Sequence, residues 1–123
     1  MAGRRTIAIV GKASAVGALC DALRPSFSLE LAPTIETLAA RPAQADCVVL
    51  HADSAEQGIA LFETAYSTFD SVPIVLAVPA EGARQAAALL TVGLTDLIHL
   101  PMPRVRLVRR IERALNGPRR ERR

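Results

Sequence analysis

Asp46-Cys47-Val48-Val49-Leu50-His51 is the stretch of sequence that decides the fold. Four successive apolar residues, 47–50, are typical of a strand covered on both faces, as a central strand of a parallel sheet is. A histidine follows where this strand ends. Because parallel α/β sheets bind ligands beyond the carboxyl ends of their strands, the residue at position 51 bears directly on function.

Strand-like and helix-like segments alternate along the whole chain. The apolar patterns predict strands at residues 6–10, 27–31, 47–50, 74–78 and 95–100. Helical spacing and helix-end signals predict helices at residues 14–24, 34–40, 54–69, 81–92 and 105–115. Strict alternation favours a parallel sheet with helices on both faces, because right-handed crossovers join parallel neighbours. The sequence therefore predicts an α/β fold, a doubly wound (βα)5 sandwich around a parallel five-stranded sheet.

Length and composition indicate one domain with an aliphatic core, since half of the 123 residues are hydrophobic and only 3% are aromatic. We expect this domain to span residues 1–117, with 118–123 as a basic tail or the start of a linker. No apolar run approaches the roughly 20 residues of a membrane span, and no signal peptide is evident, so we expect a cytoplasmic location. Cys20 and Cys47 lie in apolar segments and are expected to be buried, reduced thiols.

Charge is distributed unevenly along the chain. Residues 1–103 hold six Lys and Arg against ten Asp and Glu, a balance of −4, whereas residues 104–123 hold nine against two, a balance of +7. The last predicted helix is amphipathic with a basic outer side. We expect no nucleic-acid binding there, because aromatic residues are absent and arginines near a helix carboxyl end also complement the helix dipole.

Two further segments resemble strands of a known protein family. They are Pro-Ile-Val-Leu-Ala-Val at 73–78 and Gly-Leu-Thr-Asp-Leu-Ile-His-Leu-Pro-Met at 93–102. Together with residues 46–51 and the strand spacing, they give a chain that resembles the CheY-like response-regulator receiver family over residues 6–116. The resemblance implies a flavodoxin/CheY-like three-layer sandwich with strand order 2-1-3-4-5. It also implies a role in two-component signal transduction or a phosphorelay, through a protein partner or a downstream output domain.

The positions that carry phosphoryl chemistry in that family are altered here. In the family, two carboxylates after the first strand hold magnesium, for which hard oxygen ligands are needed; this chain has Gly11 and Lys12. The resemblance places His51 at the phosphoacceptor aspartate. It places Ala77 at the hydroxyl residue ending the fourth strand and Leu100 at the lysine before the proline. The aromatic switch of the fifth strand corresponds to Leu97.

We interpret the chain as a non-enzymatic pseudo-receiver with no cofactor and no metal, acting as a phosphorylation-independent interaction, signalling or localisation module. One alternative is a sensor that binds a small ligand or anion near Lys12 and His51. Another is a receiver phosphorylated at the displaced Asp53. Lys12 is expected to be exposed, or else paired with Asp53. His99 should point away from the pocket, because side chains alternate along a strand, so the two histidines do not suggest a metal site.

An interaction face is expected on the last two helices and the strand between them, residues 83–115. In the receiver family this region forms the usual dimer and partner face, so the resemblance implies a homodimer here. The candidate contact residues are Ala86, Leu89, Leu90, Arg106, Arg109, Arg110 and Arg113.

Overall fold

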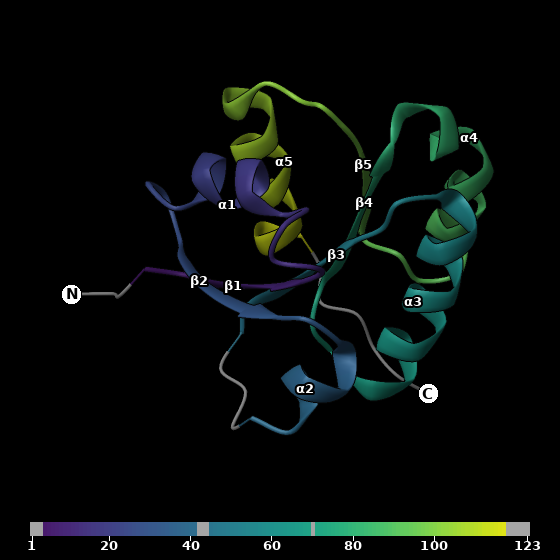
Figure 1. Ribbon diagram of the computed structural model, residues 1–123, viewed down its shortest axis with the longest axis horizontal. Helices are drawn as coiled ribbons and strands as arrows, with labels where there is room; N and C mark the ends of the chain where they lie inside the picture. Colours follow the sequence, from purple (N-terminus) through teal and green to yellow (C-terminus); the bar gives the residue numbers. More distant parts are fainter. Residues whose placement is uncertain (1–3, 42–44, 70, 118–123) are drawn as a thin grey trace.

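The computed structural model describes residues 4–41, 45–69 and 71–117, which form one parallel five-stranded sheet between two layers of helices (Figure 1). The strand order is β2-β1-β3-β4-β5, and every pair of neighbours is parallel. Both the doubly wound topology and the order 2-1-3-4-5 are as predicted. The strands are β1 (Thr6–Val10), β2 (Ser28–Ala32), β3 (Cys47–His51), β4 (Ile74–Pro79) and β5 (Asp96–Leu100).

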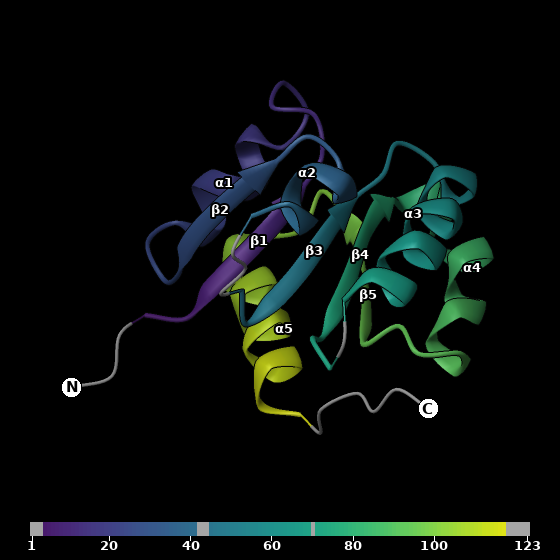
Figure 2. The same cartoon turned by 90° about the horizontal axis from the view of Figure 1, so that it is seen from below.

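The helices divide between the two faces of the sheet (Figures 1 and 2). On one face lie α1 (Gly17–Leu23) and α5 (Arg104–Asn116), which pack against each other. On the other lie α2 (Ile35–Ala39), α3 (Ala55–Thr68) and α4 (Ala83–Ala86), the last flanked by the 3-10 segments η1 (Ala80–Gly82) and η2 (Ala87–Thr91). In the described part of the chain, no helix is long and apolar enough to span a bilayer.

Strand β3 explains the two-faced core. Its side chains alternate, so that Cys47 and Val49 pack beneath α1 and α5 while Val48 and Leu50 pack beneath α2, α3 and α4. All four are at most 1% exposed, as the uninterrupted apolar run predicted. Burial raises the pKa of the Cys47 thiol to about 12, with a smaller contribution from the Asp46 carboxylate, so this thiol stays protonated. Cys20 is also buried and free.

Helix α3 begins at the predicted capping sequence. The Ser54 hydroxyl accepts a hydrogen bond from the Gln57 amide nitrogen (3.1 Å), and the Gln57 side-chain oxygen accepts one from the Asp53 amide nitrogen (2.6 Å). These two bonds satisfy backbone donors at the start of the helix. They also fix the loop that follows β3, so Asp53 has a defined position at the edge of the sheet.

The fourth helical segment differs from the prediction of one helix over residues 81–92. Only four residues are α-helical, and 3-10 segments precede and follow them. The side chains that face the core, Ala83, Ala86 and Leu89, are three residues apart. A 3-10 helix has three residues per turn, so it keeps this row in line better than an α-helix does. Helix α1 also starts later than predicted, because residues 12–16 form a turn in which the Lys12 carbonyl accepts bonds from Ala15 and Val16.

Gly93 ends this segment in a conformation that other residues rarely adopt. Its φ is +121°, and a Cβ atom built there would overlap the Tyr66 ring. The glycine therefore lets the chain turn closely past α3 into β5.

We predict that Gly93→Ala lowers the free energy of unfolding by about 2 kcal/mol or more, because it adds both backbone strain and the clash with Tyr66. Urea denaturation measures the change. Gly17→Ala is the matched control: a Cβ there meets nothing within 4 Å, so stability should be unchanged or slightly higher. Equal stability of the Gly93→Ala variant and the parent would contradict the role given to this glycine.

Candidate functional site

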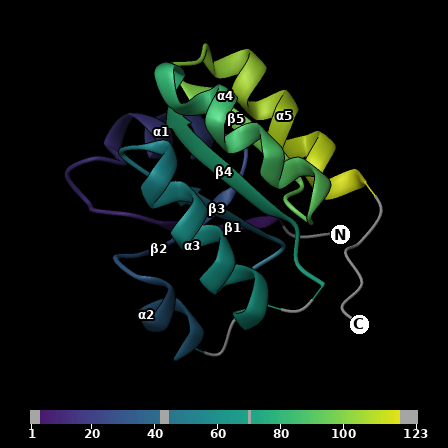
Figure 3. The same ribbon diagram turned by 90° about the vertical axis from the view of Figure 1, so that its right-hand side faces the viewer.

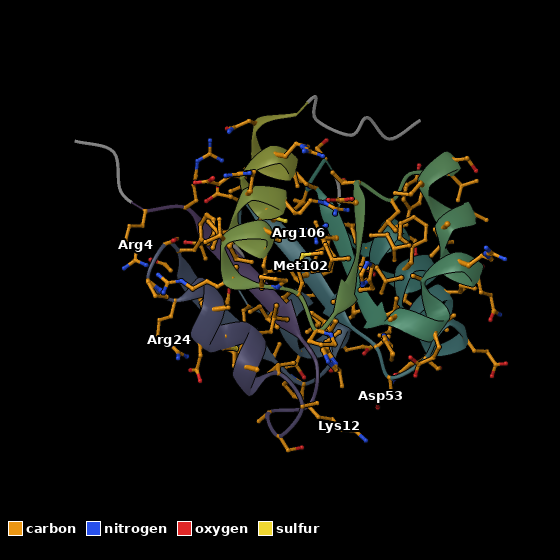
Figure 4. All side chains as sticks on the ribbon, turned by 90° about the horizontal axis from the view of Figure 1, so that it is seen from above. Arg4, Lys12, Arg24, Asp53, Met102 and Arg106 are labelled. Atoms are coloured by element: carbon orange, nitrogen blue, oxygen red, sulfur yellow. The ribbon has the colours of Figure 1, made fainter. Side chains whose placement is uncertain are left out.

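The candidate site lies at the edge of the sheet where β1, β3, β4 and β5 end. Gly11 and Lys12 follow β1, His51 is the last residue of β3, and Pro79 and Leu100 end β4 and β5. Figure 4 shows the Lys12 and Asp53 side chains at this same edge. Because the strands are parallel, residues far apart in the sequence meet here, where such sheets usually bind ligands.

Gly11 and His51 pack directly against each other at the centre of this edge. A Cβ atom on Gly11 would lie 3.0 Å from His51 Cβ and 2.9 Å from Val16 Cγ1. The Gly11 amide nitrogen donates to the Ala32 carbonyl (3.0 Å), which holds the backbone in place. The structure therefore leaves no room for a side chain at the first position after β1, where the resemblance would require a carboxylate.

These residues do not fit a magnesium ion. Gly11 offers no side-chain ligand, and the Lys12 ammonium group repels a cation from the next position. Over the described ranges 4–41, 45–69 and 71–117, His, Cys, Asp and Glu side chains nowhere gather in a group of three or more that would hold a metal.

Two of the hollows at this edge are lined by His51. The larger has a volume of about 490 Å³ and lies between α1 and the ends of β4 and β5. Its wall is apolar apart from His51 and Asp53; the lining residues are Ala15, Ala18, Leu19, Ala22, His51, Ala52, Asp53, Val78, Pro79, Leu100, Pro101, Met102 and Leu107. The smaller hollow, of about 100 Å³, is lined by Val10, Gly11, Lys12, Ala15, Pro33, His51, Asp53, Gln57 and Leu61. The two hollows share Ala15, His51 and Asp53.

The structure brings the predicted site residues to one edge of the sheet, but Ala77 lines neither hollow. His51 and Leu100 line the larger hollow, and His51 also lines the smaller one. Ala77 is fully buried in the core beneath α1 and α5, two residues before the end of β4. Ala77 pairs in register with His51, but the β4 residues that line the hollow are the next two, Val78 and Pro79. His99 is exposed and lines neither hollow, as expected.

Lys12 and Asp53 do not form the ion pair considered from the sequence. Both side chains are exposed and line the smaller hollow. Among the described residues, the ion pairs within 4 Å involve neither of them. Two opposite charges therefore face the same hollow without neutralising each other by direct contact.

The expected interaction face needs a correction. Ala86 is 0% exposed and Leu89 is 8% exposed, and both belong to the core beneath α3 and α4, so neither can contact a partner. The resemblance placed them in the interface, but both side chains pack into the core. Leu90 (45% exposed) remains on the surface with Arg106, Arg109 and Arg113.

Arg110 is engaged within the domain. Its guanidinium group donates to both carboxylate oxygens of Asp96, each at 2.7 Å, and to the Leu97 carbonyl (2.8 Å). The hydrogen bonds to Asp96 raise the pKa of Arg110, so the charged pair persists at any physiological pH. This bidentate contact joins α5 to β5.

Sequence reasoning missed two features of this region. One is the pair between Asp96 and Arg110, which are too far apart in the sequence to be matched without the fold. The other is the larger hollow, which the spacing of three alanines in the sequence could have indicated. Ala15, Ala18 and Ala22 are spaced as one side of a helix, where small side chains leave space next to the loop after β5.

Comparison with solved structures shows which fold this is. The N-terminal signal receiver domain of a two-component system response regulator from Bacteroides fragilis matches with a TM-score of 0.81 at 18% identity, over 94% of this chain and 99% of that one. The non-phosphorylated HemR receiver domain from Leptospira biflexa matches with a TM-score of 0.73 at 23% identity, over 96% and 99%. The chain has the receiver-domain fold.

The receiver fold is also found as a part of larger regulators. Full-length FixJ from B. japonicum matches with a TM-score of 0.71 at 18% identity, over 92% of this chain but only 60% of that chain. The sequence itself matches no protein-family model, and no curated protein matches it significantly. At these identities the likeness establishes the receiver fold, and the chemistry of the site has to be argued from its own residues.

We predict that Gly11→Asp, which introduces a carboxylate at the first position after β1, lowers the free energy of unfolding by about 1–3 kcal/mol because the side chain overlaps Val16 and His51. Lys12→Asp at the exposed neighbouring position should change stability by less than about 0.5 kcal/mol. Thermal or urea denaturation of both variants measures the difference. A Gly11→Asp variant as stable as the parent would show that the edge has room for the carboxylate.

Proposed function

We propose that this receiver fold is a non-catalytic pseudo-receiver, a phosphorylation-independent module for protein–protein interaction, signalling or localisation. The close packing of Gly11 against His51 is the observation that carries the proposal. The last residue of β3 is a histidine and not a carboxylate, and a carboxylate side chain at position 11 would crowd Val16 Cγ1 and His51 Cβ, which supports the proposal.

The acceptor carboxylate, the metal-binding carboxylates and the lysine act together in phosphoryl transfer. Their joint absence is therefore stronger support for the proposal than the absence of any one of them. Transfer to a carboxylate needs the nucleophile itself and positive charge that neutralises the phosphoryl oxygens, from a metal ion and a basic side chain. Here the nucleophile position is His51, the metal positions are Gly11 and Lys12, and the lysine position is Leu100, which lines an apolar wall. An oxyanion placed against Leu100 and Pro79 would lose its hydration without gaining a hydrogen bond.

Asp53 is a poor replacement acceptor. It is exposed, and it lies one residue before the Ser54 cap, where a negative charge near the amino end of α3 stabilises the helix. Within the described part of the chain, the only charged partner that the smaller hollow offers is Lys12, because no other charged side chain lines it. Phosphorylation at Asp53 remains the alternative to this proposal. Incubating the protein with a phosphoryl donor tests it directly.

The face formed by α4, η2, β5 and α5 is the proposed contact surface for a protein partner, an output domain or a second copy of the chain (Figure 3). Leu90 and Val92 are 45% and 58% exposed there, and Arg106, Arg109 and Arg113 lie exposed on α5. The exposed apolar pair and the exposed arginines suit a partner that offers apolar and acidic groups. The buried, free cysteines fit a reducing compartment such as the cytoplasm.

We predict no covalent phosphate after incubation with acetyl phosphate and Mg²⁺, as measured by intact mass spectrometry without acid treatment. A receiver that retains the acidic residues is the positive control in the same tube. The Asp53→Asn variant identifies the acceptor if mass is added. A stoichiometric gain of one phosphate in the parent, lost in Asp53→Asn, would establish the displaced acceptor and overturn the proposal.

We further predict that Leu90→Glu weakens self-association by about tenfold or more, since it places a charge at the centre of an apolar contact. Light scattering coupled to size exclusion measures the oligomeric state across a range of concentrations. Leu31→Glu is the matched control, because Leu31 is 38% exposed on β2, at the opposite edge of the sheet. An unchanged oligomeric state for Leu90→Glu, or an equal effect of Leu31→Glu, would remove this face from the proposal.

A further inference from the structure

The larger hollow has the size and the position of a small-molecule site. Ligand pockets usually enclose about 300–1,000 Å³, and this hollow, of about 490 Å³, lies at the carboxyl edge of the sheet. Ala18 and Ala22 form one wall, and Leu100 and Met102 contribute to the apolar lining. Such a surface favours an aliphatic, thioether or aromatic group over a polar one.

The smaller hollow adds two charges of opposite sign at the polar end of the larger one. Lys12 and Asp53 both line it, and neither is in an ion pair within the residues that the structure describes. His51 and Asp53 belong to both hollows, so a molecule in the larger hollow has its polar end next to these charges. Figure 4 shows the two charged side chains together at this edge.

The charges limit the class of ligand. An anion satisfies Lys12 but is repelled by Asp53, and a cation satisfies Asp53 but is repelled by Lys12. A neutral apolar molecule uses neither. A molecule with an ammonium and a carboxylate group joined to one apolar body satisfies both charges and fills the larger hollow.

We propose that the two hollows form one binding site for a free amino acid with an apolar side chain. Its carboxylate faces Lys12, its ammonium group faces Asp53, and its side chain occupies the larger hollow. The inference rests on the proposed function in one respect, namely that this edge no longer serves phosphoryl transfer. The ligand would then bias the module in place of a phosphoryl group.

The test uses the full chain and three probes, L-leucine, L-methionine and L-phenylalanine, in a thermal-shift assay followed by titration calorimetry. We expect the melting temperature to rise with the concentration of at least one probe and not with glycine, which has no side chain. N-acetyl-L-phenylalanine and L-phenylalaninamide each lack one charge. They should bind up to about fivefold more weakly than L-phenylalanine, since an ion pair between exposed groups contributes at most about 1 kcal/mol.

Three variants locate the site. Lys12→Met and Asp53→Asn should each weaken binding by up to about fivefold, and Ala18→Leu should abolish it by filling the larger hollow from an exposed helix position. Glu36→Gln, an exposed charge on α2, is the control that should leave binding unchanged. Lys12 is also the single lysine of the chain, so NMR of the ¹³C-methylated side chain reports directly on ligand contact.

No binding of any of the three probes at millimolar concentration would overturn the inference. Equal binding of the N-acetyl and amide compounds would also overturn it, by showing an apolar pocket without charge selection. Failure here leaves the acetyl phosphate result untouched. Phosphate incorporation in the preceding experiment would instead remove both proposals at once.

Discussion

The contact between Gly11 and His51 is the constraint on which the rest of the site depends. Strand β3 is buried on both faces, so its last residue has a fixed place at the carboxyl edge. A Cβ atom at position 11 would lie 2.9 Å from Val16 Cγ1 and 3.0 Å from His51 Cβ, so glycine fits there without a shift of these neighbours. The end of β3 therefore presents an imidazole in place of a carboxylate, and the crowding by Val16 and His51 disfavours a metal-binding carboxylate beside it.

The sheet tolerates His51 and Gly11 at its carboxyl edge because the residues at this edge are not the source of its stability. Aliphatic side chains on both faces of the central strands fill two cores, and buried apolar area is the main source of folding free energy. Residues beyond the strand ends contribute little to either core, so chemistry there can change while the receiver fold remains. The larger hollow is a consequence: Leu100 and Pro79 make its wall apolar, and the alanines of α1 leave it open.

The sequence was sufficient to predict the topology and most of the strands, because continuous apolar runs such as residues 47–50 and 74–78 are too short for buried helices and fit central strands of an alternating chain. Helix ends were predicted less well. Residues 14–16 were predicted as the start of a helix but belong to a turn instead. The row of Ala83, Ala86 and Leu89 favours 3-10 geometry that a helical pattern does not reveal. At the site, counting along the strands led to His51 and Leu100, and both line the larger hollow. Ala77 pairs in register with His51, but its side chain is fully buried in the core, which the apolar run of β4 did not reveal. The pair of Asp96 with Arg110 and the shape of the larger hollow depend on how α1, β5 and α5 pack, which no local pattern encodes.

The central claim is that this edge of the sheet does not bind a phosphoryl group. The most direct test is an amide ¹H–¹⁵N correlation spectrum recorded during titration with beryllofluoride and Mg²⁺, which mimic a phosphoryl group on a carboxylate. We expect no saturable shifts at Gly11, Lys12, His51 or Asp53, and none across β5 and α5. Saturable shifts that start at these residues and extend to the β5–α5 face would contradict the claim, because they would show a working phosphoryl site coupled to a conformational change.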